Sequence, residues 1–256
     1  MALATLGLSV VTMLAGCGGG GSAASVASGG SAAPSLSALA AVGEQIFHDP
    51  SLSKHHNQAC ASCHVAEVGH AGPLSSGAVE TGSDGHSLGS RVAPSLRYLA
   101  YNRAFRFDAG TPTGGFFWDG RAATLAEQAK GPLLNPAEMA NDSVDAVISQ
   151  LAQSSYAPAF KALFGDDIFT RPTAAFEGVA RALQAYQQED ADFAPFSSKY
   201  DAFLRGQAQL SAQELRGLLA FNSSSKGNCA ACHPSGMGAT GGLPLFTDFS
   251  YDVLGV

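Results

Sequence analysis

Two copies of one five-residue pattern contain the residues best suited to chemistry. Residues 60–64 read CASCH and residues 229–233 read CAACH, so each copy has two cysteines three positions apart and then a histidine. On a helix, positions i and i+3 share a face, which lets both sulfurs reach the two vinyl groups of one porphyrin. The imidazole that follows then lies beneath the iron.

Cys-x-x-Cys-His is the attachment signature of c-type haem, so we predict two covalently bound haem c groups. The residues that hold them are Cys60, Cys63 and His64 for the first group, and Cys229, Cys232 and His233 for the second, with the two histidines as iron ligands.

Three other readings of the cysteines are weaker. Paired zinc knuckles usually lie about 15–20 residues apart, whereas Cys60 and Cys229 are far apart in the chain. A disulfide within each motif would leave both histidines unexplained. A thioredoxin-like pair needs a surrounding βαβ pattern, and strand signals are scarce.

Composition restricts the class of protein. The chain has 256 residues, 46% hydrophobic and 14% charged, which suits one large folded domain or two small ones. Its net charge is −7 and its isoelectric point is near 5.4, and the sequence has no cluster of basic residues that could bind nucleic-acid phosphates. We therefore exclude nucleic acid as a partner.

The first residues are typical of an exported lipoprotein. An apolar run ends in Leu-Ala-Gly-Cys at Cys17, which resembles the lipobox of bacterial lipoproteins, and residues 18–37 are rich in Gly, Ser and Ala. We interpret residues 1–17 as a lipoprotein signal peptide and residues 18–37 as a flexible linker. The protein is then expected in the periplasm, anchored to lipid through Cys17. A buried first helix is the alternative.

The rest of the chain reads as helices that present the two motifs. Helical periodicity appears at residues 36–47, 123–129, 144–152, 172–188 and 211–221. Long loops are expected at residues 69–90 and 108–115. The fold class predicted is all-α, with two tandem cytochrome c-like haem domains and long ordered loops. Residues 38–190 form the first domain and residues 191–256 the second.

With these parts assembled, the chain resembles the bacterial dihaem cytochrome c peroxidases, a family that includes dihaem enzymes maturing a tryptophan-derived quinone cofactor. The resemblance rests on GEQIFHDPSLS, CASCH, RVAPSL, FFWDGRAATLAEQAKGPLLNPAEM, CAACH and FTDFSYDVLGV. In the longest of these stretches, Trp118, Gln128 and Glu138 follow one another at intervals of ten residues.

The resemblance implies roles for these three residues. Glu138 is the acid/base that moves a proton between the peroxide oxygens, Gln128 orients the peroxide, and Trp118 lies on the electron path between the haems. The first haem meets hydrogen peroxide, and the second receives electrons from a small periplasmic cytochrome c or cupredoxin. Taken singly, Glu138 could be a first-turn helix acid, Gln128 a surface residue and Trp118 core packing.

Several positions depart from the family pattern. Val92 stands where peroxidases commonly have a calcium-binding asparagine, which argues against calcium. His86 is a candidate resting-state ligand of the first iron or a solvated loop residue. The far ligand of the second haem is often a methionine. Here Met139 is expected to pack and Met237 lies too near His233, so we interpret the chain as truncated.

Three functions remain open from the sequence. The leading hypothesis is a periplasmic dihaem peroxidase that reduces hydrogen peroxide. The alternatives are a dihaem cytochrome that only transfers electrons, and an enzyme that oxidises side chains of a partner protein. A homodimer is expected only because members of the family that the chain resembles are often dimers.

Overall fold

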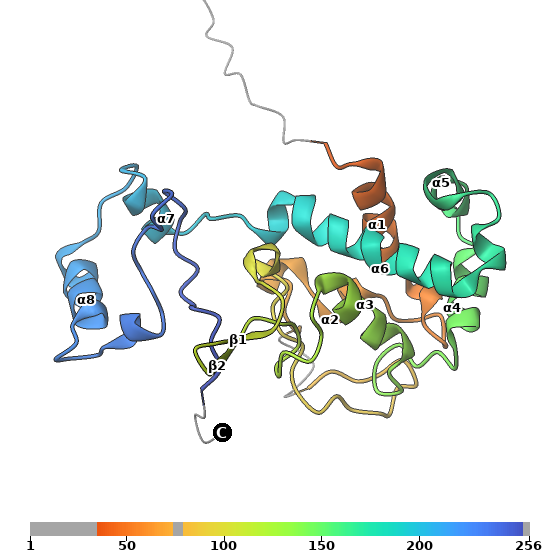
Figure 1. Ribbon diagram of the computed structural model, residues 1–256, viewed down its shortest axis with the longest axis horizontal. Helices are drawn as coiled ribbons and strands as arrows, with labels where there is room; N and C mark the ends of the chain where they lie inside the picture. The colour runs from red at the N-terminus through yellow and green to blue at the C-terminus, as the bar shows by residue number, and fades with distance from the viewer. Residues whose placement is uncertain (1–34, 74–78, 253–256) are drawn as a thin grey trace, which may run out of the picture. The chain divides into compact units, whose positions relative to one another are not determined.

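The computed structural model describes residues 35–73 and 79–252, and within them helices dominate (Figure 1). The α-helices are α1 (Ala38–His48), α2 (Cys60–Cys63), α3 (Leu125–Leu134), α4 (Val144–Leu151), α5 (Ala157–Phe164), α6 (Pro172–Glu189), α7 (Lys199–Leu204) and α8 (Ala212–Asn222). Short 3₁₀ helices are η1 (Pro50–Leu52), η2 (Ala66–Val68), η3 (Leu99–Tyr101), η4 (Ile168–Thr170), η5 (Ala191–Phe193) and η6 (Cys229–Ala231). Two strands, β1 (Arg106–Asp108) and β2 (Thr111–Thr113), form an antiparallel hairpin.

The five predicted helices are all present, with shifts at their ends. The largest shift is in α3, which begins two residues later than predicted and continues through Pro132 to Leu134. Helices α5 and α7, which are eight and six residues long, were not predicted. The loop predicted at residues 108–115 was wrong in part, because it contains β2 of the hairpin. The fold is therefore mostly helical rather than strictly all-α.

The predicted signal peptide, and the linker as far as residue 34, lie outside the described residues. The division into domains at residues 38–190 and 191–256 stays a prediction. None of the described helices is both long enough and apolar enough to span a bilayer.

The core is built around the long helix α6. Its Pro172 stands in the first turn, where the missing N–H costs nothing, and its apolar residues lie on the face turned to α1, α3 and α4. Helix α1 crosses α6 so closely that a Cβ on Gly43 would overlap the Ala182 carbonyl. Glycine at this position is what allows the two backbones to meet.

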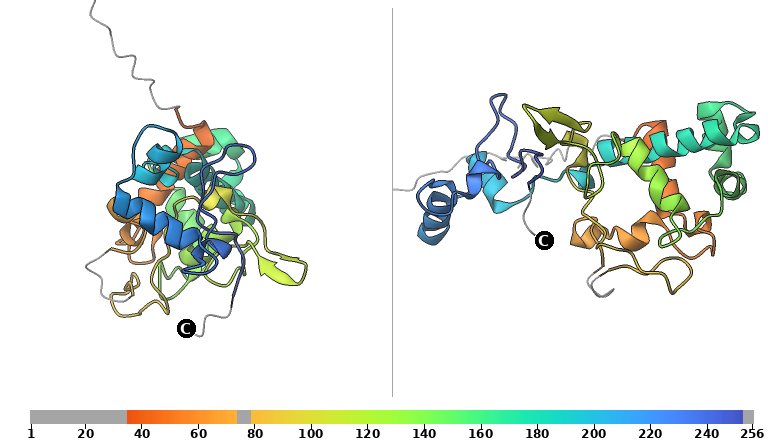
Figure 2. Two further views of the ribbon diagram at one scale, coloured as in Figure 1. Left: turned by 90° about the vertical axis from the view of Figure 1, so that its left-hand side faces the viewer. Right: turned by 60° about the horizontal axis from the view of Figure 1, so that its bottom comes forward.

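Helix α3 lies against α6 and leads into the turn that forms one wall of the candidate site (Figure 2). Thr124 caps its first turn by accepting a hydrogen bond from Glu127 N at 3.1 Å. Pro132 sits inside the helix and has no N–H to donate to the Gln128 carbonyl. The helix ends two residues later, and the chain turns sharply toward α4.

The hairpin β1–β2 projects from the helices (Figure 2) and is joined by the segment that follows the second motif. Gly114 N donates to the Phe249 carbonyl at 2.8 Å, and Tyr251 N donates to the Pro112 carbonyl at 3.0 Å. The Tyr251 hydroxyl donates to the Gly114 carbonyl at 2.9 Å. Segments more than a hundred residues apart in the chain therefore share this small strand edge.

Candidate functional site

The first motif opens onto a cavity of about 450 Å³. Helix α2 is a single turn, so the sulfurs of Cys60 and Cys63 reach the cavity from neighbouring positions on one face. Its apolar walls include Phe47, Leu96 and Leu183. The volume is within the range of about 300–1,000 Å³ typical of cofactor pockets.

His64 is held in the orientation that a metal ligand needs. Its Nδ1 lies 3.0 Å from the His70 carbonyl, and with the proton on Nδ1 its Nε2 keeps the lone pair that binds iron. Burial lowers the pKa of His64 below its ordinary value, opposed by the hydrogen bond to His70 and the negative charge of Glu80. The imidazole is therefore kept neutral, which is the ligating form.

The cysteines of the first motif are thiols whose environment disfavours the thiolate form. Burial raises the pKa of Cys60 to about 12 and the pKa of Cys63 to about 11, which does not favour a nucleophilic thiolate. Both are free of disulfides. Across residues 35–73 and 79–252, no three His, Cys, Asp or Glu side chains gather as a metal-binding group. These observations agree with covalent haem attachment.

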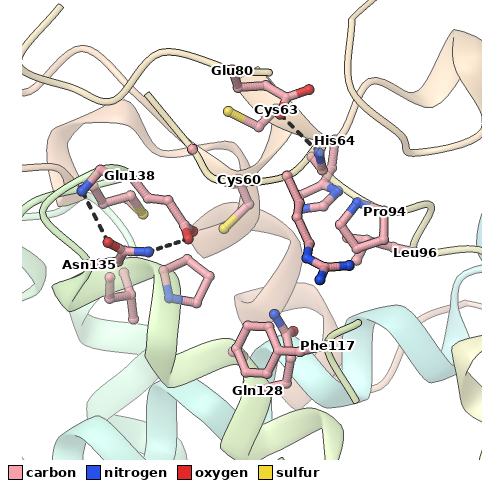
Figure 3. Close-up of a pocket in the computed structure, with 18 of the residues that line it drawn as sticks. Cys60, Cys63, His64, Glu80, Pro94, Leu96, Phe117, Gln128, Asn135 and Glu138 are labelled. Atoms are coloured by element: carbon pink, nitrogen blue, oxygen red, sulfur yellow. Dashed lines mark hydrogen bonds between the residues drawn. The ribbon is translucent and has the colours of Figure 1, made fainter. Parts of the chain in front are cut away.

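Glu138 faces the same cavity from a turn between α3 and α4. Its N–H donates to the Asn135 carbonyl at 3.0 Å, and the Asn135 side-chain Nδ2 donates to Glu138 Oε1 at 2.6 Å. From another loop, Ser83 N donates to the Glu138 carbonyl at 2.7 Å. Figure 3 shows Glu138 and His64 on opposite sides of the cavity, with Phe117 and Gln128 along its lower edge.

The charge state of Glu138 is set by opposing influences. Burial raises its pKa above the ordinary value, whereas the hydrogen bond from Asn135 and the Arg121 cation lower it, and Glu80 raises it slightly. Arg121 lines the cavity with its guanidinium 3.7 Å from the centre of the Phe117 ring. A half-buried carboxyl with a raised pKa is suited to act as both acceptor and donor of a proton.

Gln128 and Trp118 also line this cavity, so the structure brings all three predicted side chains to it. Trp118 is 49% exposed, and its Nε1 donates to the Val92 carbonyl at 3.1 Å. It also lines a second cavity of about 230 Å³, bordered by Phe249 and Tyr251.

The structure shows where each of these residues lies relative to its alternative reading. Trp118 is not core packing, because half of it is exposed. Gln128 is half-buried against the cavity, and Glu138 lies in a turn after a helix rather than in the first turn of one.

The second motif repeats the local arrangement of the first. Cys229 lies on η6, and His233 Nδ1 lies 2.8 Å from the Phe246 carbonyl, as His64 Nδ1 does from His70. The Phe246 ring makes an edge contact with Phe221 at 5.9 Å. Unlike the first site, His233 and its neighbouring cysteine are exposed to solvent.

Comparison with known proteins agrees with this geometry. The model of the di-haem cytochrome c peroxidase family matches residues 37–209. The chain belongs to this family. Proteins of this kind carry two c-type haems, and both attachment motifs are present here.

Named relatives fall into two groups. Methylamine utilization protein MauG of Paracoccus denitrificans is 40% identical over 230 residues, 88% of this chain and 58% of that protein. Cytochrome c551 peroxidase of Pseudomonas aeruginosa is 34% identical over 197 residues, 75% of this chain and 49% of that protein. The crystal structure of the diheme peroxidase BthA from Burkholderia thailandensis superposes with a TM-score of 0.79 at 39% identity, covering 86% of this chain and 55% of that one. The chain spans about half the length of these relatives.

Of the other predicted positions, Val92 and Met139 line the cavity of the first haem site, whereas His86 and Met237 do not. His86 is exposed and is not among the residues that line the 450 Å³ cavity; its N–H donates to Asp84 at 2.9 Å. Met139 is 4% exposed and packs in the core, as predicted. Met237 is 47% exposed. Val92 contributes a carbonyl that accepts from Trp118, and its side chain is an exposed hydrocarbon.

Sequence reasoning missed the residues that support the site. Asn135, which holds Glu138 by a hydrogen bond, was not predicted. It lies in the same stretch of sequence as Glu138, and the asparagine–proline pair there is a signal for the end of a helix. His70 is 4% exposed and stacks on Phe193 at 4.1 Å. Gln58 donates from Nε2 to Cys63 Sγ at 3.6 Å. Nothing in their local patterns points to a cofactor.

Proposed function

We propose that the chain is the haem-bearing part of a periplasmic c-type peroxidase that reduces hydrogen peroxide to water. The electrons come from a small redox protein, a cytochrome c or a cupredoxin, through the second haem. The observation that carries this proposal is Glu138, which faces His64 across a cavity that both haem cysteines border. A protein that only transfers electrons has no need of a carboxyl at this position.

Cys60, Cys63 and His64 would hold the first haem, which would supply the iron that reacts with peroxide and the electrons that cleave the peroxide bond. The protein supplies proton movement. Glu138 would accept a proton from one peroxide oxygen and return it to the other, while Asn135 holds its carboxylate in place.

The other cavity residues orient peroxide and limit water. The Gln128 amide can donate to one peroxide oxygen, and Pro132 and Phe117 line the cavity with apolar surface. Trp118 borders both cavities, which suits an oxidisable side chain on the path of electrons toward this site.

The test is Glu138→Gln in the haem-loaded protein. We expect both haem spectra to persist and steady-state peroxide turnover to fall by about 10²–10⁴-fold, the usual contribution of general acid–base catalysis. Glu177→Gln is the matched control, because Glu177 is exposed and only pairs with Lys130. Full turnover in Glu138→Gln would remove the acid–base assignment. No turnover in wild type with a reduced donor would favour a purely electron-transferring cytochrome.

A second candidate is oxidation of side chains on a partner protein. It is favoured by the 40% identity to methylamine utilization protein MauG. Incubation of the haem-loaded protein with peroxide and a candidate partner, followed by mass spectrometry of the partner, separates it from the peroxidase. Lipid anchoring through Cys17, a homodimer and the absence of calcium stay predictions.

A further inference from the structure

A tyrosine and a carboxylate meet in the core at a place that the proposed peroxidase reaction does not use. Tyr156 directly precedes α5 and is 6% exposed. Its hydroxyl donates to Asp49 Oδ2 at 2.6 Å, a length typical of hydrogen bonds to a charged oxygen. The other oxygen of Asp49 accepts from Ser51 N at 2.8 Å and caps η1. The carboxylate is therefore fixed in place with one oxygen turned to the phenol.

This pair is connected to the first attachment motif through the hydrophobic core. Tyr156 belongs to the buried cluster against which Cys60 packs. Burial raises the pKa of Tyr156 above its ordinary value, and the hydrogen bond to Asp49 and the charge of that carboxylate add to this. The phenol thus keeps its proton in the resting protein, next to a carboxylate that can act as a base.

A phenol that loses an electron becomes a strong acid, so its oxidation is easy only where a base can take the proton at once. We propose that Tyr156 and Asp49 form a redox-active pair that stores one oxidising equivalent from the first haem. Tyr156 gives one electron to the haem that hydrogen peroxide has oxidised, its O–H bond breaks, and the proton forms a new O–H bond with Asp49 Oδ2. One electron from the reduced donor and the same proton then restore the phenol. This inference rests on the proposed function.

Tyr186 provides a natural comparison within the same core. It is 5% exposed and belongs to the same buried cluster. Among the described residues, its hydroxyl donates to no carboxylate, so it lacks the base that Tyr156 has. Tyr186 should therefore resist oxidation although it is equally buried.

The experiment adds hydrogen peroxide to the haem-loaded protein without a reduced donor, freezes the sample and records its electron paramagnetic resonance spectrum. We expect a tyrosyl radical in wild type and in Tyr186→Phe, and the loss of most of that signal in Tyr156→Phe and Asp49→Asn. Asparagine at position 49 keeps a side-chain oxygen for Ser51 N, so η1 stays capped. Ring-deuterated tyrosine should narrow the signal and confirm its source.

The haem absorption spectrum reports the proposed function separately. If peroxide changes the haem spectrum and no radical depends on Tyr156, the redox pair is refuted and the peroxidase stands. If peroxide leaves the haem spectrum unchanged, the proposed peroxidase function is refuted. The same samples are then oxidised with a photoexcited ruthenium complex and a sacrificial acceptor, which tests the redox pair without peroxide. A radical that requires Tyr156 and Asp49 would then support the pair, and its absence would overturn it.

Discussion

Asn141 holds the turn that carries Glu138, and its removal should weaken both the fold and the site. Asn141 is 5% exposed, and its Nδ2 donates to the Leu52 and Leu133 carbonyls, each at 2.8 Å. It thereby ties η1 to the end of α3 across the chain. Replacement by alanine removes both donors without adding any atom that could clash.

The magnitude follows from what each carbonyl retains. The Leu133 carbonyl keeps a hydrogen bond from Asn141 N at 3.2 Å, so the loss of its second donor should lower the free energy of unfolding by about 0.5–1.5 kcal/mol. No other donor to the Leu52 carbonyl is found in the described residues. Leaving that carbonyl without a partner should lower the free energy of unfolding by about 1–3 kcal/mol. Asn141 Oδ1 is itself buried without a partner, and its removal recovers part of this loss. The expected net destabilisation by Asn141→Ala is about 2 kcal/mol.

The assay is guanidinium unfolding of the haem-loaded protein followed by far-ultraviolet circular dichroism. Asp142→Ala is the neighbouring control, because its ion pair with Lys54 is exposed and worth about 0–1 kcal/mol. The midpoint should fall clearly for Asn141→Ala with an unchanged slope. Equal midpoints for the two variants would refute the view that this amide secures the turn.

Three further predictions concern the cavity and the core. Because burial raises the pKa of Glu138, peroxide turnover should fall as the pH drops through that raised value, and a rate that stays flat down to the ordinary glutamate range would contradict it. Gly43→Ala should lower the melting temperature markedly, since its Cβ would overlap the Ala182 carbonyl; an unchanged melting temperature would mean that α1 can shift freely. Trp118→Phe should keep the single-turnover reaction with peroxide and slow steady-state turnover; stopped-flow spectroscopy separates the two, and equal steady-state rates would exclude Trp118 from the electron path.

The sequence alone was sufficient to predict features that depend on residues close together in the chain. The two CxxCH motifs need only a single helical turn to align two sulfurs and a histidine, and both turns are present as α2 and η6. The same holds for the helix that begins at Ser211, where Ser211 and Glu214 form the predicted capping box. Glu138 was found because the spacing of a whole stretch resembled a family.

Contacts between distant segments were decided only by the tertiary structure. His70 supplies the carbonyl behind His64 because a loop folds back onto the haem turn. Tyr156 and Asp49 are 107 residues apart, and they meet only because α5 packs near the end of α1. Periodicity describes which face of a helix is buried but not which residue of another segment it meets, since that choice depends on how all side chains fill the core together.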